Sequence, residues 1–222
     1  MTSVSLGAGE VHVWAVDLEG PGAANPHAAL RRLLGRYLGE EPDAIGFVRG
    51  PGGKPELAKS WSRLRFNLSH SGSLALVALA GDREVGVDVE RLDPARASAV
   101  IVDAVFSPRE ASILRPLREP ARTRAFFSCW TRKEACAKAT GEGVAALERL
   151  DVLGRRRVEG LRLCDLDVGD GYAAALAVAG RAPKVRLFRL GSEASVAAGD
   201  GPPRSEREAS RRRAEDRVEH AA

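Results

Sequence analysis

The sequence predicts an α+β fold made of two similar halves, and three observations carry this prediction. The order strand, helix, strands occurs twice along the chain. A strand-like run opens each set, at residues 11–14 and 85–88. Hydrophobic residues make up 44% and charged residues 29% of the 222 residues, which is enough for an ordinary core. We expect an N-terminal half at residues 1–84 and a C-terminal half at residues 85–190.

The first half is predicted to begin with a strand at residues 11–16 and a helix at residues 27–38. One apolar stripe defines that helix, formed by Leu30, Leu33, Leu34, Tyr37 and Leu38. A glycine- and proline-rich run at residues 50–53 must be a loop. Gly81-Asp82 is typical of a hairpin turn between two strands. The strands expected here lie at residues 45–48, 64–68, 74–80 and 85–90.

The second half is predicted to be helical at first. Ser107 and Glu110 form a capping box, with Pro108 at the first helical position. A longer helix is expected at residues 121–140, ended by Gly141. Further strands are expected at residues 150–153, 160–166, 172–178 and 185–190. The apolar pattern stops at residue 191, and residues 204–222 mix six arginines with five acids. Residues 191–222 are therefore expected to be a disordered charged tail or a lone exposed helix.

Composition excludes several classes of protein. The three cysteines form no CxxC pair, so we expect small apolar residues in a reducing compartment rather than a disulfide framework. No apolar run is long enough to span a membrane, and residues 1–10 lack the pattern of a signal peptide. A cytoplasmic protein without a membrane partner is expected. The net charge of +4 is mild and aromatic residues are 5%, which argues against nucleic-acid binding.

Two carboxylates are the first candidates for chemistry. Asp88 and Glu90 are two positions apart on a predicted strand, so both side chains point to one face while Val87 and Val89 face the core. Two such carboxylates repel each other unless a cation lies between them. A solvated strand face remains the alternative interpretation.

The predicted helix adds a third carboxylate. Trp130, Glu134 and Lys138 are spaced by four residues and share one helix face. Ordinary pairing of Glu134 with Lys138 is the alternative. Three carboxylates suit a hard cation, and Mg²⁺ fits best because it shares its coordination sphere with substrate phosphates. Zinc is disfavoured, since no His or Cys cluster has ligand spacing.

Two other signals are weak. His70 ends a strand in a polar run, where many histidines are only surface residues. Gly53-Lys54-Pro55 is no Walker A loop, because proline stands in place of the Ser/Thr.

An ordered set of motifs resembles the Sfp-type 4′-phosphopantetheinyl transferases. Each motif is weak alone, but the order is specific and extends from about residue 11 to residue 190. The matching segments are Gly53-Lys54-Pro55, residues 67–71 (Asn-x-Ser-His-Ser), residues 86–90 (Gly-Val-Asp-x-Glu), Phe106-Ser107 with Glu110, and residues 130–143. The resemblance also implies two pseudo-twofold-related halves with the site at their interface.

By this resemblance, the protein moves phosphopantetheine from coenzyme A to a serine of an apo acyl or peptidyl carrier protein and releases 3′,5′-ADP. Asp88, Glu90 and Glu134 would hold Mg²⁺, or Mn²⁺, against the pyrophosphate. Lys138 and His70 would contact phosphate oxygens. Glu134 is the best candidate to accept the serine proton. The cofactor cleft would be lined by Lys54, Ser69 and Lys133. Two halves in one chain make a monomer sufficient.

One departure from the family pattern concerns coenzyme A. Family members carry a longer, basic segment between the first strand and the first helix, which binds the 3′-phosphate. Here residues 17–25 are short and rich in glycine and proline. Arg31, Arg32 or Arg36 are possible substitutes. The runner-up is thus a degenerate relative that binds a carrier protein or nucleotide without turnover, and a third reading is an unrelated α+β adaptor.

Overall fold

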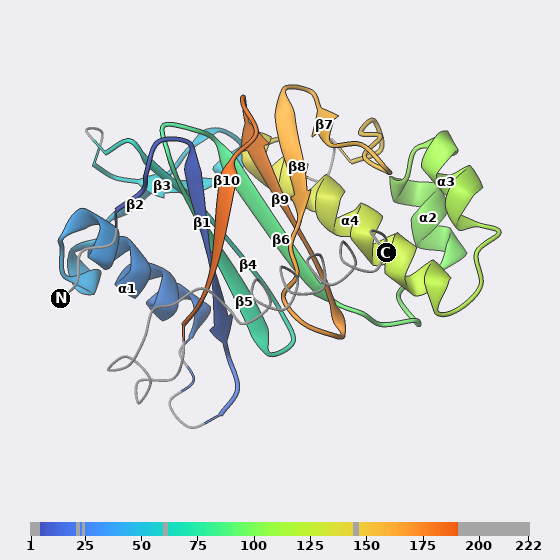
Figure 1. Ribbon diagram of the computed structural model, residues 1–222, viewed down its shortest axis with the longest axis horizontal. Helices are drawn as coiled ribbons and strands as arrows, with labels where there is room; N and C mark the ends of the chain where they lie inside the picture. The colour runs from blue at the N-terminus through green and yellow to red at the C-terminus, as the bar shows by residue number, and fades with distance from the viewer. Residues whose placement is uncertain (1–4, 21–22, 24, 60–61, 144–146, 191–222) are drawn as a thin grey trace, which may run out of the picture.

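The computed structural model describes residues 5–20, 23, 25–59, 62–143 and 147–190, and it is a mixed α+β structure (Figure 1). Two four-stranded sheets occupy the middle, with helix α1 (Pro26–Leu38) on one side and helix α4 (Ala121–Thr140) on the other. Two short helices, α2 (Ala99–Val105) and α3 (Pro108–Leu114), lie beside α4.

The first sheet has the order β10-β1-β5-β4. Strand β5 runs antiparallel to both β1 and β4, and β10 runs parallel to β1. Its strands are β1 (Glu10–Asp17), β4 (Leu64–Ser71), β5 (Leu74–Gly81) and β10 (Lys184–Leu190).

The second sheet has the order β6-β9-β8-β7 and repeats part of this topology. In the first sheet, β5 pairs antiparallel with both β1 and β4. In the second sheet, β9 pairs antiparallel with both β6 and β8 in the same way. The strands are β6 (Val85–Arg91), β7 (Arg157–Val158), β8 (Leu161–Asp165) and β9 (Tyr172–Ala179).

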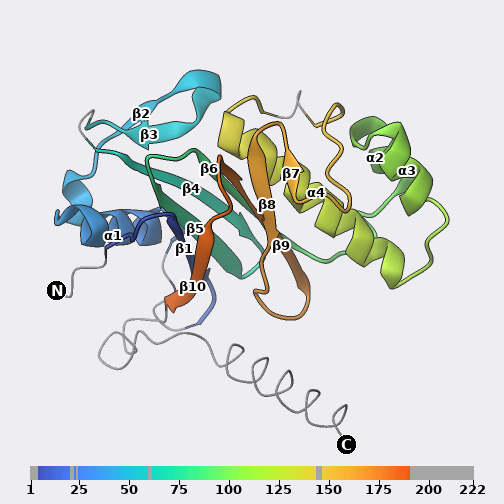
Figure 2. The ribbon, with the colours of Figure 1, turned by 45° about the horizontal axis from the view of Figure 1, so that its top comes forward.

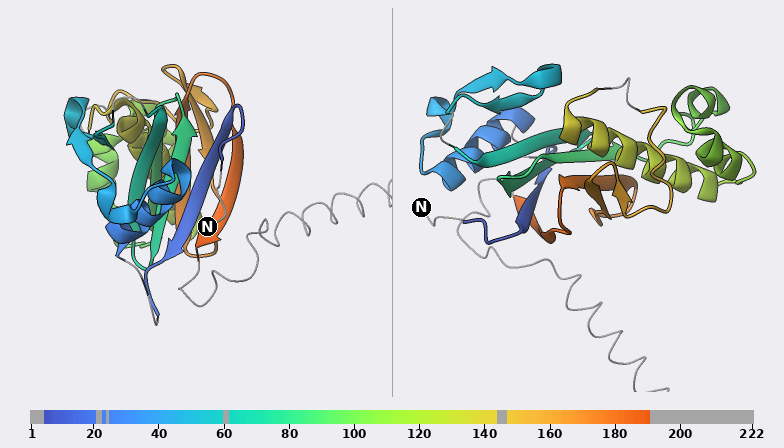
Figure 3. Two further views of the ribbon diagram at one scale, coloured as in Figure 1. Left: turned by 90° about the vertical axis from the view of Figure 1, so that its left-hand side faces the viewer. Right: turned by 90° about the horizontal axis from the view of Figure 1, so that it is seen from above.

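Three apolar clusters arrange these elements in four layers. Alternate residues of β1 and β5 meet Val85, Val87 and Val89 of β6 in a central cluster between the sheets. The opposite face of the first sheet packs on α1, and the opposite face of the second packs on α4. Figure 3 shows this arrangement from the end and from above. The prediction that Val87 and Val89 face the core is confirmed, so Asp88 lies on the face towards α4.

A small hairpin stands apart from both sheets. Strands β2 (Phe47–Arg49) and β3 (Pro55–Leu57) pair only with each other among the described strands, and a 3₁₀ turn, η2 (Pro51–Gly53), joins them. A second 3₁₀ turn, η1 (Pro42–Ala44), precedes the hairpin. Figure 2 shows the hairpin beyond α1, with its tip directed to the end of α4.

Several sequence predictions are confirmed. Helix α4 has the predicted bounds, and Gly141 ends it in the left-handed conformation. The Ser107–Glu110 capping box is present. Within the described residues, no helix is both long enough and apolar enough to cross a membrane.

Other predictions are wrong. Residues 81–84 form no hairpin, because β5 and β6 belong to different sheets and the chain crosses between them. Residues 150–153 are not a strand, since the Val152 and Leu153 amides donate to the Glu110 carboxylate instead of to a neighbouring strand. Strand β10 lies in the first sheet, whereas the sequence pattern assigns its residues to the second half. The predicted tail at 191–222 lies outside the described residues.

Candidate active site at the junction of the two sheets

Side chains of β4 join the two sheets. Asn67 accepts a hydrogen bond from the Val87 amide (2.9 Å), and Ser69 accepts one from the Val89 amide (3.4 Å). The Ser71 hydroxyl accepts from the Arg91 amide (3.1 Å) in the same way. The constant offset shows that β4 and β6 run in the same direction. Side-chain oxygens take the place of backbone carbonyls where the strands separate.

The two serine hydroxyls are therefore free to donate to carboxylates on β6. Ser69 Oγ donates to Asp88 Oδ1 and Ser71 Oγ donates to Glu90 Oε2, both over 2.8 Å. Asp88 is buried, whereas Glu90 is partly exposed. The junction thus fixes the orientation of both carboxylates that the sequence selected.

Helix α4 covers these carboxylates because β6 carries a glycine at the contact. A Cβ atom on Gly86 would lie 2.1 Å from the Ala135 carbonyl oxygen and 2.5 Å from the Ala139 nitrogen. Any larger residue would push the helix away from the strand. The close approach brings Glu134 and Lys138 over β6, as their spacing predicts. Trp130 instead stacks on Phe126, with ring centroids 6.1 Å apart, at the edge of the core.

The carboxylates impose a negative local field. Burial raises the pKa of Asp88, although Lys138 and Ser69 oppose this rise. The pKa of Glu134 is raised by burial and then by the neighbouring charge of Asp88. Lys138 Nζ lies 2.6 Å from Asp88 Oδ1 and 3.0 Å from Ser69 Oγ. A cation at this place lowers the cost of keeping these carboxylates charged.

The carboxylates of this site have the oxygen donors that a hard cation prefers, but Lys138 and Arg96 pair with two of them. The buried Asp88 Oδ2 has no hydrogen-bond partner. Arg96 pairs with Glu90 Oε2 over 3.1 Å. In the part of the chain that the structure describes, no three His, Cys, Asp or Glu side chains are arranged to hold a metal ion. Asp88 Oδ2 is available to such an ion, and oxygen donors of this kind suit Mg²⁺.

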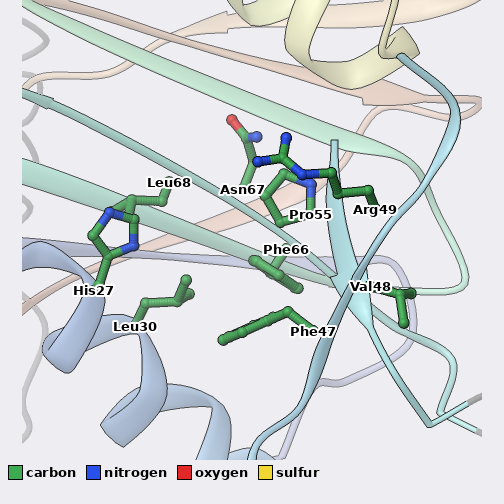
Figure 4. A pocket seen from close by; sticks show the side chains of 9 residues that line it. All are labelled: His27, Leu30, Phe47, Val48, Arg49, Pro55, Phe66, Asn67 and Leu68. Carbon is green, nitrogen blue, oxygen red and sulfur yellow. The ribbon is translucent and has the colours of Figure 1, made fainter. Parts of the chain in front are cut away.

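Two cavities open beside the junction. The smaller, of about 180 Å³, is lined by Gly52, Lys54, Glu134 and Lys138, among others. The larger, of about 400 Å³, lies between α1, β4 and the hairpin. Asn67 lines both. Figure 4 shows the aromatic rings and the polar groups that line the larger cavity: His27, Leu30, Phe47, Val48, Arg49, Pro55, Phe66, Asn67 and Leu68.

Lys133 is not a cleft residue, which corrects the prediction that it lines the cofactor site. Its side chain is completely buried, and its ammonium lies 2.8 Å from Glu110 Oε2. It also donates to the carbonyl oxygens of Leu147 and Leu150. One step around the helix from Glu134, Lys133 points into the core and uses its donors there.

His70 and Ser69 are divided by the alternation of β4. Ser69 faces Asp88, whereas His70 is exposed and shares the other face with Phe66 and Leu68. The structure therefore keeps His70 away from the carboxylates and on the side of the larger cavity. Sequence reasoning missed Asn67 and Ser71 as site residues, and the polar alternation at positions 67, 69 and 71 was the signal for them.

Comparison with known proteins identifies relatives of this chain. Residues 84–182 match the 4′-phosphopantetheinyl transferase superfamily. The chain is 39% identical over 160 residues to 4′-phosphopantetheinyl transferase HetI of Nostoc sp., covering 68% of each chain. It is 38% identical over 111 residues to AcpT of Salmonella typhi, covering 50% of this chain and 56% of AcpT. It is 29% identical over 175 residues to the human L-aminoadipate-semialdehyde dehydrogenase-phosphopantetheinyl transferase, covering 74% of this chain and 51% of that protein.

Fold and site define a mixed α+β protein with a buried carboxylate and lysine centre at the junction of two sheets. With the extent of its match to HetI, the chain belongs to the 4′-phosphopantetheinyl transferase superfamily.

Proposed function

We propose that this protein transfers the 4′-phosphopantetheine group of coenzyme A to a serine of an apo acyl or peptidyl carrier protein, with Mg²⁺ or Mn²⁺, and releases 3′,5′-ADP. The observation that carries the proposal is the junction itself. Asp88, Glu134 and Lys138 come from two elements of one half, and Ser69 of the other half bonds to both Asp88 and Lys138. Both charge signs needed to bind a pyrophosphate together with its cation are present in one place.

Each side chain has a definite task in this proposal. Asp88, Glu90 and Glu134 would hold the metal ion, which would supply charge neutralisation for the pyrophosphate. Lys138 leaves Asp88 and contacts a phosphate oxygen. The serine Oγ of the carrier forms a bond to the β-phosphorus, and the bond from that phosphorus to the bridging oxygen breaks. Most of the acceleration comes from positioning and charge neutralisation.

Glu134 accepts the serine proton in this scheme. In the metal-free site, burial and the charge of Asp88 raise the pKa of Glu134. A bound metal ion would lower that pKa, so the role of Glu134 as base rests on its position beside the reacting centre. The proton passes directly or through a water molecule, while the electron pair of the broken bond stays on 3′,5′-ADP.

The two cavities suit the rest of coenzyme A. The larger has Phe47 and Phe66 in its wall, and Figure 4 shows Arg49 and Asn67 near each other. Aromatic walls favour a planar base, and the N–H groups of His27 and the Arg49 guanidinium can donate to phosphate. The smaller cavity lies against Glu134 and Lys138 and receives the pyrophosphate. His70 lies on β4, as Asn67 does, and contacts a phosphate oxygen in this proposal.

The remaining architectural features follow from the same proposal. We propose that the two halves are related by a pseudo-twofold axis with the site between them, and that β10 belongs to the first half with its sheet. The protein acts as a cytoplasmic monomer, without a nucleic-acid partner.

The decisive experiment measures the mass of a carrier protein. An apo acyl or peptidyl carrier domain is incubated with the protein, coenzyme A and Mg²⁺. We expect the carrier to gain one phosphopantetheine, and we expect no gain in EDTA. A full gain in EDTA would contradict the assignment of the three carboxylates.

The runner-up is a relative that binds without catalysis, and the short segment between β1 and α1 favours it. Residues 18–25 contain no lysine or arginine. An unmodified carrier that nevertheless binds the protein in a titration would support this second function.

A further inference from the structure

The ammonium group of Lys54 lies between three elements rather than in open cleft. It donates to Glu84 Oε2 (2.8 Å), to the Val85 carbonyl oxygen (3.0 Å) and to the Ala139 carbonyl oxygen (3.1 Å). An ammonium has three hydrogens, so all its donors are used by the protein. The side chain is only 9% exposed. Lys54 therefore has no donor left for a ligand while these bonds persist.

Each acceptor has a reason to need this cation. Ala139 lies in the last turn of α4, where carbonyl oxygens lack helical partners and carry the negative end of the helix dipole. Val85 begins β6 beside the junction, at the edge of the second sheet. Glu84 supplies a carboxylate that also accepts from Arg65 Nε over 3.0 Å. One side chain thus satisfies the helix end and the strand edge together.

The hairpin that carries Lys54 is held at both of its ends. Near its base, Phe47 lies 5.5 Å from Phe66 between ring centroids, and the Arg31 guanidinium lies 5.0 Å from the Phe47 ring. At its tip, a Cβ on Gly52 would lie only 1.6 Å from the Gly141 carbonyl oxygen. The tip backbone therefore touches the end of α4. The right-hand view in Figure 3 shows the hairpin reaching from the side of α1 to that end.

The same hairpin is a wall of both cavities. Gly52 and Gly53 line the smaller cavity, while Phe47, Arg49 and Pro55 line the larger. Because the hairpin belongs to neither large sheet, its placement depends on side-chain contacts, which include the packing of Phe47 and Leu57 against the core beside α1. Through Lys54, the hairpin donates hydrogen bonds to the Val85 and Ala139 carbonyl oxygens of the second half.

We infer that Lys54 is a positioning residue that fixes the β2–β3 hairpin against α4 and β6, so that the wall shared by the two cavities is in place before coenzyme A arrives. The consequence for binding rests on the proposed function. A loose wall must be ordered by the substrate, which weakens binding of coenzyme A. The groups that act on the phosphorus, Glu134 and Lys138, remain where they are. The effect should fall on KM more than on kcat.

The test compares Lys54→Met with Arg65→Met in the full-length protein. Methionine keeps the apolar stem and removes the ammonium. Arg65→Met is the control. It removes the other cation that pairs with Glu84 and leaves the three hydrogen bonds of Lys54 intact. Hydrogen exchange of residues 47–57 is measured without ligand, together with KM, kcat and calorimetric binding of coenzyme A.

We expect Lys54→Met to speed exchange in residues 47–57 selectively and to raise KM and the Kd for coenzyme A by about ten- to a hundredfold, with kcat within about threefold. Arg65→Met should leave all four quantities near wild type. Should Lys54→Met unfold the whole chain, Glu84→Gln replaces it. That variant keeps both carbonyl contacts and should give a smaller, still selective, increase in exchange.

Two outcomes overturn the inference. Unchanged exchange with weaker binding would mean that Lys54 contacts the ligand directly. Unchanged exchange and unchanged binding would mean that the hairpin is held without it. A wild-type protein that neither binds coenzyme A nor modifies a carrier would refute the proposed function, whereas the exchange measurement would still decide whether Lys54 fixes the hairpin.

Discussion

Ser69 Oγ lies 2.8 Å from Asp88 Oδ1, so a hydroxyl of the first sheet orients the carboxylate of the second. The same oxygen accepts from the Val89 amide. The bond between these two residues makes the proposed active centre a property of the junction rather than of either sheet. A substitution at either residue should therefore lower activity more than it lowers the free energy of unfolding.

Asp88→Asn should abolish activity without weakening the metal-free fold. Burial raises the pKa of Asp88, which means that its charge is unfavourable in the folded state, and asparagine has the same shape without that charge. We expect kcat/KM to fall by at least about a hundredfold, while the thermal midpoint stays or rises. Calorimetry and a carrier-modification assay measure the two. A loss of activity that tracks a lowered midpoint would make Asp88 a structural residue.

Lys138→Met should separate metal binding from catalysis. The Lys138 ammonium lies 2.6 Å from Asp88 Oδ1 and competes with a metal ion for that carboxylate. Its removal should tighten Mn²⁺ binding by about tenfold, or about 1.4 kcal/mol, as measured by electron paramagnetic resonance of the free ion. Activity should nevertheless fall, because a phosphate contact is lost. Weaker Mn²⁺ binding in the variant would contradict the proposed competition.

Acid should destabilise the first half through His12. The buried His12 ring lies between Tyr37 Oη (2.6 Å from Nδ1) and Glu10 Oε2 (3.1 Å from Nε2), with Phe188 and Arg186 nearby. Burial lowers its pKa, while Glu10 partly offsets this effect. Below the unfolded-state pKa of about 6.5, the unfolded chain binds more protons, so the free energy of unfolding falls with falling pH.

This loss should continue down to the lowered folded-state pKa, with a slope of at most about 1.4 kcal/mol per pH unit. Urea unfolding of wild type and His12→Gln between pH 7 and pH 5 isolates the contribution of His12, since the other groups are common to both. Parallel stability curves for the two proteins would show that His12 does not titrate with folding.

Local patterns in the sequence predicted the elements well and the face of each side chain in part. Spacing predicted the face of the strand that carries Asp88 and the face of the helix that carries Glu134, because period two and period 3.6 are set by the backbone. Only the family resemblance assigned the two residues to one site. The prediction that Lys133 lines the cofactor cleft was wrong. Periodicity alone does not reveal that Lys133 pairs in the core with Glu110 of another helix. The junction was also not predictable, because no periodicity in the sequence indicates that Ser69 of β4 bonds to the backbone of β6.

Lys133→Met tests that correction. Glu110 and Lys133 are both fully buried, and the Glu110 carboxylate also accepts from the Ser107 and Val152 amides. Removing one partner leaves a buried charge uncompensated, so we expect a loss of about 3–5 kcal/mol in the free energy of unfolding. At a temperature where the variant is folded, KM for coenzyme A should match wild type. A raised KM in folded protein would return Lys133 to the cofactor site.

The final prediction concerns the 3′-phosphate of coenzyme A. Residues 18–25 contain no basic side chain, and the Arg31 guanidinium already donates to the Pro42 and Ile45 carbonyl oxygens. The His27 imidazole and the Arg49 guanidinium line the larger cavity and can donate hydrogen bonds to a phosphate.

Each charge-assisted bond to a phosphate contributes about 1.5–3 kcal/mol, which corresponds to about ten- to a hundredfold in affinity. With the basic segment missing, we expect kcat/KM for coenzyme A to exceed that for dephospho-coenzyme A by less than about a hundredfold. His27→Ala and Arg49→Ala should remove whatever preference remains, whereas Arg36→Ala, outside the cavity lining, should not. A preference above a hundredfold that survives both cavity variants would show that another part of the chain rebuilds the phosphate pocket.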